Sequence, residues 1–162
     1  MKLADVVQEW LNRLEWDDTV KQDEENQTSS LNVILSIKDQ GFNLWFETDE
    51  KKEWLRLFLY APFQALSHKF EDGIQLFNRI NASRRFGAIC LLDDGRIVFR
   101  HTVDVENTQP SVDMIDNMLG QAIKLYETWF NEISSIALTN KTAQEVFDEL
   151  DKTSEIKEGE EA

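Results

Sequence analysis

The sequence predicts a single α+β domain, an antiparallel sheet with helices packed on it. Three observations predict this class. Strand-like runs follow one another without a helix in residues 31–60, a second pair of strands meets at Asp94-Gly95, and segments of helical periodicity come before, between and after these strands. Helices that interrupt antiparallel strands do not form wound βαβ units, so the order α-βββ-α-ββ-α indicates an α+β fold.

The first helix is expected at the N-terminus. Its apolar residues recur at spacings of three and four, which places them on one helix face. They are Leu3, Val6, Val7, Trp10, Leu11 and Leu14. The next stretch, residues 17–30, is polar throughout most of its length, and we expect it to form a mobile loop.

Three strands follow as an antiparallel meander. Apolar and polar residues alternate in residues 31–37 and 42–46, which is the two-residue period of a half-buried strand. The third run, residues 54–60, is apolar on both faces. Leu55, Leu57 and Leu59 point one way, and Trp54, Phe58 and Tyr60 point the other. We therefore expect another element to cover its second face.

A helix and a hairpin occupy the middle of the chain. Helical spacing joins Phe70, Ile74, Phe77 and Ile80. The strands that follow flank Asp94-Gly95, a pair that readily takes the positive φ angles of a tight two-residue turn.

The longest helix begins after Pro110, with Ser111 as its N-cap. A central stripe, Ile115 to Ile136, is flanked by apolar residues on both sides, so the apolar arc covers about half of the helix circumference. A helix lying on a sheet needs a narrower arc. The excess predicts a second partner, either another helix or another subunit.

One domain accounts for residues 1–150, which end with a short helix over 143–150. Residues 151–162 are acidic and have little to bury, so we expect a disordered tail there.

Charge limits the classes of partner. The chain has a formal net charge of −14, from 31 acidic and 17 basic residues. Nucleic acid and anionic membranes attract positive surfaces, so we expect neither as a partner. No apolar run is long enough to span a bilayer, and the N-terminus lacks the apolar core of a signal peptide. A single cysteine cannot form an internal disulfide, which favours a cytoplasmic location.

No cofactor or metal is expected. The glycines are isolated, so no glycine-rich phosphate loop is present. The two histidines, His68 and His101, are far apart in sequence, and no Cys/His spacing fits zinc.

The segment LFNRINASRRFGAICLLDDGRIVFRHTVD resembles the central signature of the YbjN-like family of bacterial sensory transduction regulators. Its features are the pair Asn78 and Asn81 at a helix end, Gly87 in the next strand, and Arg100 after an acidic-Gly turn. The resemblance spans about residues 31–137. It implies a fold similar to that of type III secretion chaperones, small acidic homodimers that bind proteins and catalyse nothing.

Cys90 and His101 form the one candidate nucleophilic pair. If Asp94-Gly95 is a two-residue turn, Cys90 faces Phe99, and Cys90 and His101 become diagonal neighbours. The other residues on that face are apolar, so we interpret it as the core face, with a buried thiol. A three-residue loop would remove the facing relation.

The aromatic residues are a stronger indication of function. Tryptophan and tyrosine are enriched at protein interfaces, although aromatic stripes also form cores. The candidate interface residues are Trp45, Trp54, Phe58 and Tyr60 on the meander and Met118, Leu125 and Trp129 on the long helix. Whether the aromatic face of the meander is core, dimer seam or partner site stays open.

These observations predict a non-enzymatic adaptor, chaperone-like protein or regulator that forms a homodimer and binds another protein. The alternatives are an enzyme or redox protein that uses Cys90 in a site assembled from loops, and a small-molecule sensory module. Rapid labelling of Cys90 in the native state would favour the enzyme.

Overall fold

A computed structural model describes residues 2–160, with side chains up to residue 153. The helices are α1 (Leu3–Arg13), α2 (Phe70–Ala82), α3 (Val112–Leu138) and α4 (Ala143–Glu160). The strands are β1 (Lys21–Asp23), β2 (Thr28–Ile37), β3 (Gln40–Asp49), β4 (Trp54–Gln64), β5 (Ala88–Leu91) and β6 (Arg96–Asp104). A short 3₁₀ turn, η1 (Ser67–Lys69), leads into α2.

The strands form one antiparallel sheet in the order β1-β2-β3-β4-β6-β5. β2, β3 and β4 are the predicted meander, and β5 and β6 are the predicted hairpin. The predicted fold class, α+β with an antiparallel sheet packed by helices, is therefore confirmed. The predicted loop over 17–30 is wrong in part, because β1 pairs there with the first residues of β2.

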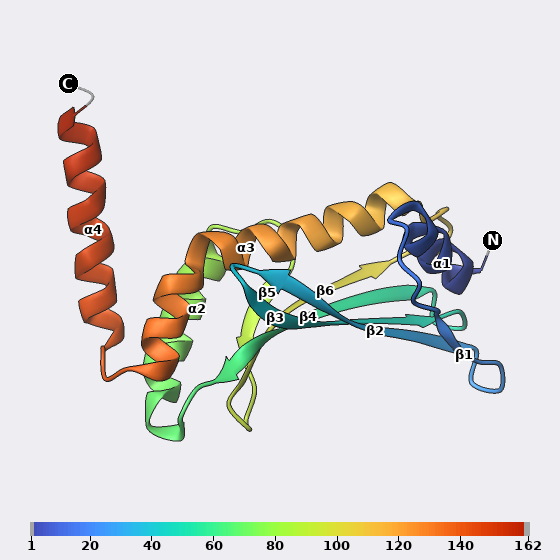
Figure 1. The fold of residues 1–162 in the computed structure, drawn as a ribbon, viewed down its shortest axis with the longest axis horizontal. Coiled ribbons are helices and arrows are strands. Elements are labelled where there is room, and N and C mark those ends of the chain that lie inside the picture. The colour runs from blue at the N-terminus through green and yellow to red at the C-terminus, as the bar shows by residue number, and fades with distance from the viewer. Residues whose placement is uncertain (1, 161–162) are drawn as a thin grey trace.

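The core lies between one face of the sheet and the helices. Figure 1 shows the long helix α3 along this face, with α1 near its start and α2 near its end. Alternate strand residues point into this layer and are fully buried, as the leucine side of β4 shows: Leu55, Leu57 and Leu59. Tyr126 of α3 is also fully buried and donates a hydrogen bond of 2.9 Å from its hydroxyl to the carbonyl of Leu59.

The helix faces match the sequence prediction in most positions. Ser111 caps α3 as predicted, since its hydroxyl accepts a hydrogen bond from the Met114 N–H at 3.2 Å. In α2 the buried side is turned slightly from the predicted one, because Leu76 is buried and Ile74 is 60% exposed. Leu14, predicted on the buried face of α1, lies after the helix and is 36% exposed.

Asn81 has a structural role that differs from a simple helix cap. Its side-chain amide donates to the carbonyl of Ile89 and accepts from the Ile89 N–H, each at 2.9 Å. The side chain thus pairs with β5 as a neighbouring strand would. This pairing explains why an asparagine stands at the end of α2.

The C-terminal helix is longer than predicted. α4 runs from Ala143 to Glu160, whereas the sequence predicted a helix over 143–150 only. Figure 1 shows α4 extending away from the sheet. The last residues of the predicted tail, 161 and 162, lie outside the described residues. The division into a domain over 1–150 and a disordered tail stays a prediction.

Candidate functional site

The second face of the sheet is open. No helix among the described residues packs on it, and Figure 1 shows the helical layer on the opposite side only. The expectation that another element covers the aromatic side of β4 is therefore wrong for residues 2–160. Trp45, Phe58 and Tyr60 are half-buried there by their strand neighbours rather than by a second layer.

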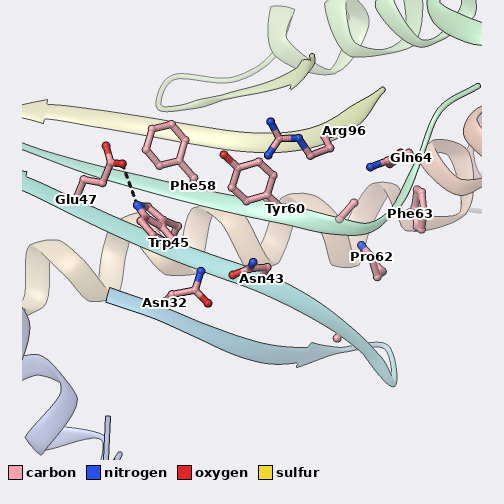
Figure 2. A pocket seen from close by; sticks show the side chains of 12 residues that line it. Asn32, Asn43, Trp45, Glu47, Phe58, Tyr60, Pro62, Phe63, Gln64 and Arg96 are labelled. Atoms are coloured by element: carbon pink, nitrogen blue, oxygen red, sulfur yellow. Dashed lines mark hydrogen bonds between the residues drawn. The ribbon is translucent and has the colours of Figure 1, made fainter. Parts of the chain in front are cut away.

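Strand register brings these aromatic residues together. Trp45 of β3 lies opposite Phe58 of β4, and Asn43 lies opposite Tyr60. The rings of Phe58 and Tyr60 are nearly parallel, with centroids 6.4 Å apart and an interplanar angle of 24°. We name the surface formed by Trp45, Phe58 and Tyr60 the aromatic face (Figure 2). Sequence alternation alone places all three on one side.

Polar groups surround the aromatic face. The Trp45 indole N–H donates to Glu47 Oε1 at 2.9 Å, and the Arg96 guanidinium carbon lies 5.4 Å from the centre of the Tyr60 ring. Asn43 Oδ1 is buried and accepts no hydrogen bond within the described residues. The register of β4 and β6 shifts between Tyr60 and Gln64. A hollow of about 820 Å³ lies at this end of the surface.

The remaining candidate on the meander, Trp54, lies further along the same side of β4. The Arg56 guanidinium carbon is 3.9 Å from the centre of its ring. Cation–π contact of this kind holds a surface arginine in place. Trp54 is half-buried and does not line the hollow beside Tyr60.

The helical half of the predicted interface is corrected by the structure. Met118 and Leu125 are 2% and 1% exposed and belong to the core of this chain. α1 and α2 contact α3 and, together with the sheet, account for its wide apolar arc. Of the three helix residues, Trp129 alone is half-buried and keeps some exposed surface. Within the described residues, neighbouring helices and the sheet thus cover most of this arc, and the homodimer stays a proposal.

The predicted approach of Cys90 and His101 is also wrong. Leu92 N–H donates to the Arg96 carbonyl at 2.9 Å, so the hairpin loop has three residues and ends on Gly95, whose φ is 88°. Such loops place a positive φ at their last residue. The register therefore moves by one position, and Cys90 faces Val98 instead of Phe99.

This shift puts the thiol and the imidazole on opposite sides of the sheet. Cys90 lies on the open side, half-buried. His101 is opposite Leu57, a core residue, and its Nδ1 is buried without a hydrogen-bond partner in the described part of the chain. Burial, and to a smaller extent the charge of Arg84, lower the pKa of His101 below its usual value. Because the two side chains lie on opposite sides of the sheet, the imidazole of His101 does not reach the Cys90 thiol.

Two further classes of site receive no support from the described residues. They contain no group of three His, Cys, Asp or Glu side chains arranged to hold a metal ion. Nor do they include a helix with the length and apolarity that crossing a bilayer requires.

A family model described as "Putative bacterial sensory transduction regulator", YbjN, matches residues 3–135. The chain belongs to the YbjN family. The match includes α1, which the resemblance read from the sequence left outside the recognisable part. No curated protein matches the chain in sequence.

A solved structure confirms the fold that the YbjN-like signature implied. A chain of the ExsC-ExsE complex is similar to this one with a TM-score of 0.51 and 11% sequence identity, over 80% of this chain and 94% of that chain. A chain of the HopA1-SchA chaperone-effector complex has a TM-score of 0.49 and 15% identity, over 79% and 91%. YbjN from E. coli has a TM-score of 0.46 and 14% identity, over 83% and 88%.

Proposed function

We propose that this member of the YbjN family is a non-enzymatic, chaperone-like regulator that binds another protein through the aromatic face. One observation carries the proposal: Trp45, Phe58 and Tyr60 form a continuous surface that no described helix covers. Membership in a family of regulators and the chaperone-like fold agree with it. Cytoplasmic location and a homodimeric state are further parts of the proposal.

The energetics favour a protein partner. Complete burial of a large apolar side chain contributes about 1.5–3 kcal/mol relative to full exposure. The three rings are already more than half buried, so a partner that covers the rest gains about a third of that contribution or less from each. Such a gain, added to the polar contacts at the rim, is typical of the aromatic centre of a protein interface.

The polar rim provides specificity. A hydrogen-bond donor of the partner that reaches Asn43 Oδ1 would satisfy a buried acceptor, and an unsatisfied buried acceptor is costly. Asn32, Gln64 and Arg96 line the same hollow and supply further donors. A partner with aromatic or aliphatic side chains and backbone N–H groups meets this combination.

Site-specific photo-crosslinking tests the proposal. Tyr60 is replaced by p-benzoylphenylalanine in the native host, and the same residue is placed at Lys124 as a control, because Lys124 is exposed on α3. We expect a discrete adduct from position 60 and none of the same mass from position 124. Adding Trp45→Ala, in a variant shown by circular dichroism to be folded, removes the adduct.

The mass of the adduct identifies the kind of partner. Twice the mass of the chain indicates a second copy, and light scattering of the purified protein then gives the dimer mass as well. A different mass indicates another protein. Equal adducts at both positions, or none at position 60, would refute the aromatic face as the binding surface.

A further inference from the structure

A cluster of arginines lies at the other end of the open side of the sheet. A pocket of about 660 Å³ there is lined by Arg56, Arg85 and Arg100 together with Phe58, Phe86, Gly87, Ala88 and Thr102. His101 also lines it, although its position on β6 faces the core side of the sheet. No acidic side chain among the described residues lines it. On a chain with 31 acidic and 17 basic residues, three arginines without an acid among the lining are an unexpected concentration of positive charge.

Strand register holds two of the arginines on the same side. Arg56 of β4 lies opposite Thr102 of β6, and the next position on that side pairs Phe58 with Arg100. Arg100 in turn lies opposite Ala88 of β5, so a small residue leaves space beside it. Arg85 comes from the segment between α2 and β5.

These arginines lack carboxylate partners. No ion pair within the described part of the chain includes Arg56, Arg85 or Arg100, whereas Arg13, Arg79 and Arg96 each pair with an aspartate. Glu47 stands opposite Arg56, but its Oε1 accepts the indole N–H of Trp45. Arg56 instead stacks on Trp54. The guanidinium groups are therefore available to an external anion.

The segment that carries Arg85 and Phe86 is held in place on both sides. Arg84 donates to the carbonyl of Gln121 on α3 at 3.2 Å. Gly87 has a φ of 65°, and a Cβ there would lie 2.2 Å from Cζ of Phe99, so the backbone passes directly over that ring. This anchoring fixes the position of the pocket wall before any ligand binds.

An exposed ring completes the pocket. Phe86 is 58% exposed, and its ring stacks on that of His101 with centroids 6.1 Å apart and an interplanar angle of 27°. His101 supports Phe86 from one side and leaves the rest of the ring free. Phe86 lines the same pocket as the three arginines, so a planar ligand group could stack on the exposed part of its ring while phosphates reach the guanidinium groups.

We propose that this pocket binds a nucleoside polyphosphate, with its phosphates on Arg56, Arg85 and Arg100 and its base on Phe86. Guanidinium groups match the geometry of phosphate oxygens and form charge-assisted hydrogen bonds with them. Aromatic side chains stack on nucleobases without regard to sequence. The site differs from a glycine-rich phosphate loop, which the sequence lacks, because side chains and not backbone N–H groups carry the positive charge.

Isothermal titration calorimetry of the purified full-length chain tests the proposal with three probes: pyrophosphate, ATP and adenosine. We expect saturable binding of pyrophosphate, tighter binding of ATP, and the weakest binding of adenosine. Arg85→Gln and Arg100→Gln each weaken pyrophosphate binding by about 10-fold or more, because each removes a charge-assisted hydrogen bond to a phosphate oxygen. Phe86→Ala weakens ATP binding and leaves pyrophosphate binding unchanged.

Arg79→Gln is the matched control, because Arg79 carries the same charge but lies on α2 and pairs with Asp151. It leaves binding of all three probes unchanged. Arg85 and Arg100 are exposed, so their replacement does not threaten the fold. As a second readout, ligand binding changes the tryptophan fluorescence through the Arg56–Trp54 contact, and Trp54→Phe removes that change.

Several results would overturn the proposal. If neither pyrophosphate nor ATP binds saturably, the pocket is not a phosphate site. If Arg79→Gln weakens binding as much as Arg100→Gln does, the ligand binds outside this pocket. If ATP binds no more tightly than pyrophosphate, the pocket does not recognise a nucleobase. If an acidic peptide binds and neither phosphate compound does, the ligand of the pocket is a protein and not a nucleotide. None of these results depends on the crosslink at Tyr60, so this site and the aromatic face are tested separately.

Discussion

Replacement of Tyr126 by phenylalanine tests whether a single hydroxyl group fastens α3 to the centre of the sheet. Tyr126 is fully buried; its hydroxyl donates to the Leu59 carbonyl at 2.9 Å and accepts from the Phe99 N–H at 3.1 Å. Leu59 and Phe99 are direct partners on β4 and β6. Phenylalanine keeps the ring and its contact with Phe42, whose centroid is 4.6 Å away, and removes only the two hydrogen bonds.

The magnitude follows from those two bonds. Each contributes about 0.5–1.5 kcal/mol net, and a buried group left without a partner costs about 1–3 kcal/mol. We therefore expect Tyr126→Phe to lower the free energy of unfolding by about 2–4 kcal/mol. Urea unfolding followed by far-UV circular dichroism measures this as a lower midpoint at an unchanged slope.

Tyr60→Phe is the matched control. It removes the same hydroxyl from the aromatic face, where that hydroxyl makes no hydrogen bond to another described residue, and we expect a change within about 0.5 kcal/mol. A Tyr126→Phe protein as stable as the Tyr60→Phe protein would show that the hydroxyl does not fasten α3 to the sheet.

Three further predictions concern the same layer. Burial raises the pKa of the Tyr126 hydroxyl, so this tyrosine ionises more readily in the unfolded chain than in the folded one. Its contribution to the free energy of unfolding is therefore complete below pH ~10 and is lost as the pH rises above that value. In urea unfolding, the difference in stability between wild type and Tyr126→Phe narrows by about 1.4 kcal/mol per pH unit above pH ~10. Gly87→Ala lowers the free energy of unfolding by about 2 kcal/mol or more, through its φ of 65° and the clash with Phe99, and a normal urea midpoint would contradict this. Lys69→Met removes a buried ammonium group that pairs with Asp72 at 2.7 Å and donates to the Lys141 carbonyl. Because Asp72 and the carbonyl then lose their donor, the change lowers the free energy of unfolding by about 1–3 kcal/mol near pH 7. The hydrogen bond from Lys69 lowers the pKa of Asp72, so this cost shrinks as the pH falls below the usual aspartate pKa of about 3.9, and a cost independent of pH would argue against the pair.

Much of the fold is predictable because alternation and helical spacing report burial directly. The buried leucines of β4 and the N-cap at Ser111 were both predictable in this way. β1 was not, because its three residues are exposed and polar and carry no apolar alternation. Its pairing comes from backbone hydrogen bonds to β2, and the side chains do not signal it.

The register of the β5–β6 hairpin could not be predicted from the residues of its turn alone. Asp94-Gly95 fits a two-residue turn in sequence, yet the loop has three residues and Gly95 occupies its last position. A Cβ at Gly95 would lie 2.5 Å from the Ala65 carbonyl oxygen, so a segment distant in sequence limits how the loop closes. One position of register moved Cys90 from the core side to the open side. A contact of this range is not visible in the hairpin sequence.

The candidate site was predictable on the sheet and only partly on the helix. The aromatic residues follow from strand parity, which depends only on neighbouring positions. Which element covers the apolar face of α3 depends on the whole chain. Sequence periodicity does not show whether α1, α2 or a second subunit packs against that face. The arginine pocket was missed because Arg56, Arg85 and Arg100 come from separate elements. A surplus of arginines without acidic neighbours in sequence is the one signal that could have indicated it.

Leu125→Glu separates the two explanations of the wide arc on α3. If that flank were a dimer seam, the variant would be a folded chain of half the native mass. Because Leu125 is 1% exposed within this chain, the carboxylate instead enters the core unpaired and costs more than about 4 kcal/mol. We therefore expect loss of the helical circular dichroism signal, whereas Lys124→Glu at the neighbouring exposed position keeps it. A folded Leu125→Glu protein with half the wild-type mass in light scattering would contradict this expectation. It would show that this side of α3 is a dimer interface and that α1 and α2 do not cover it in solution.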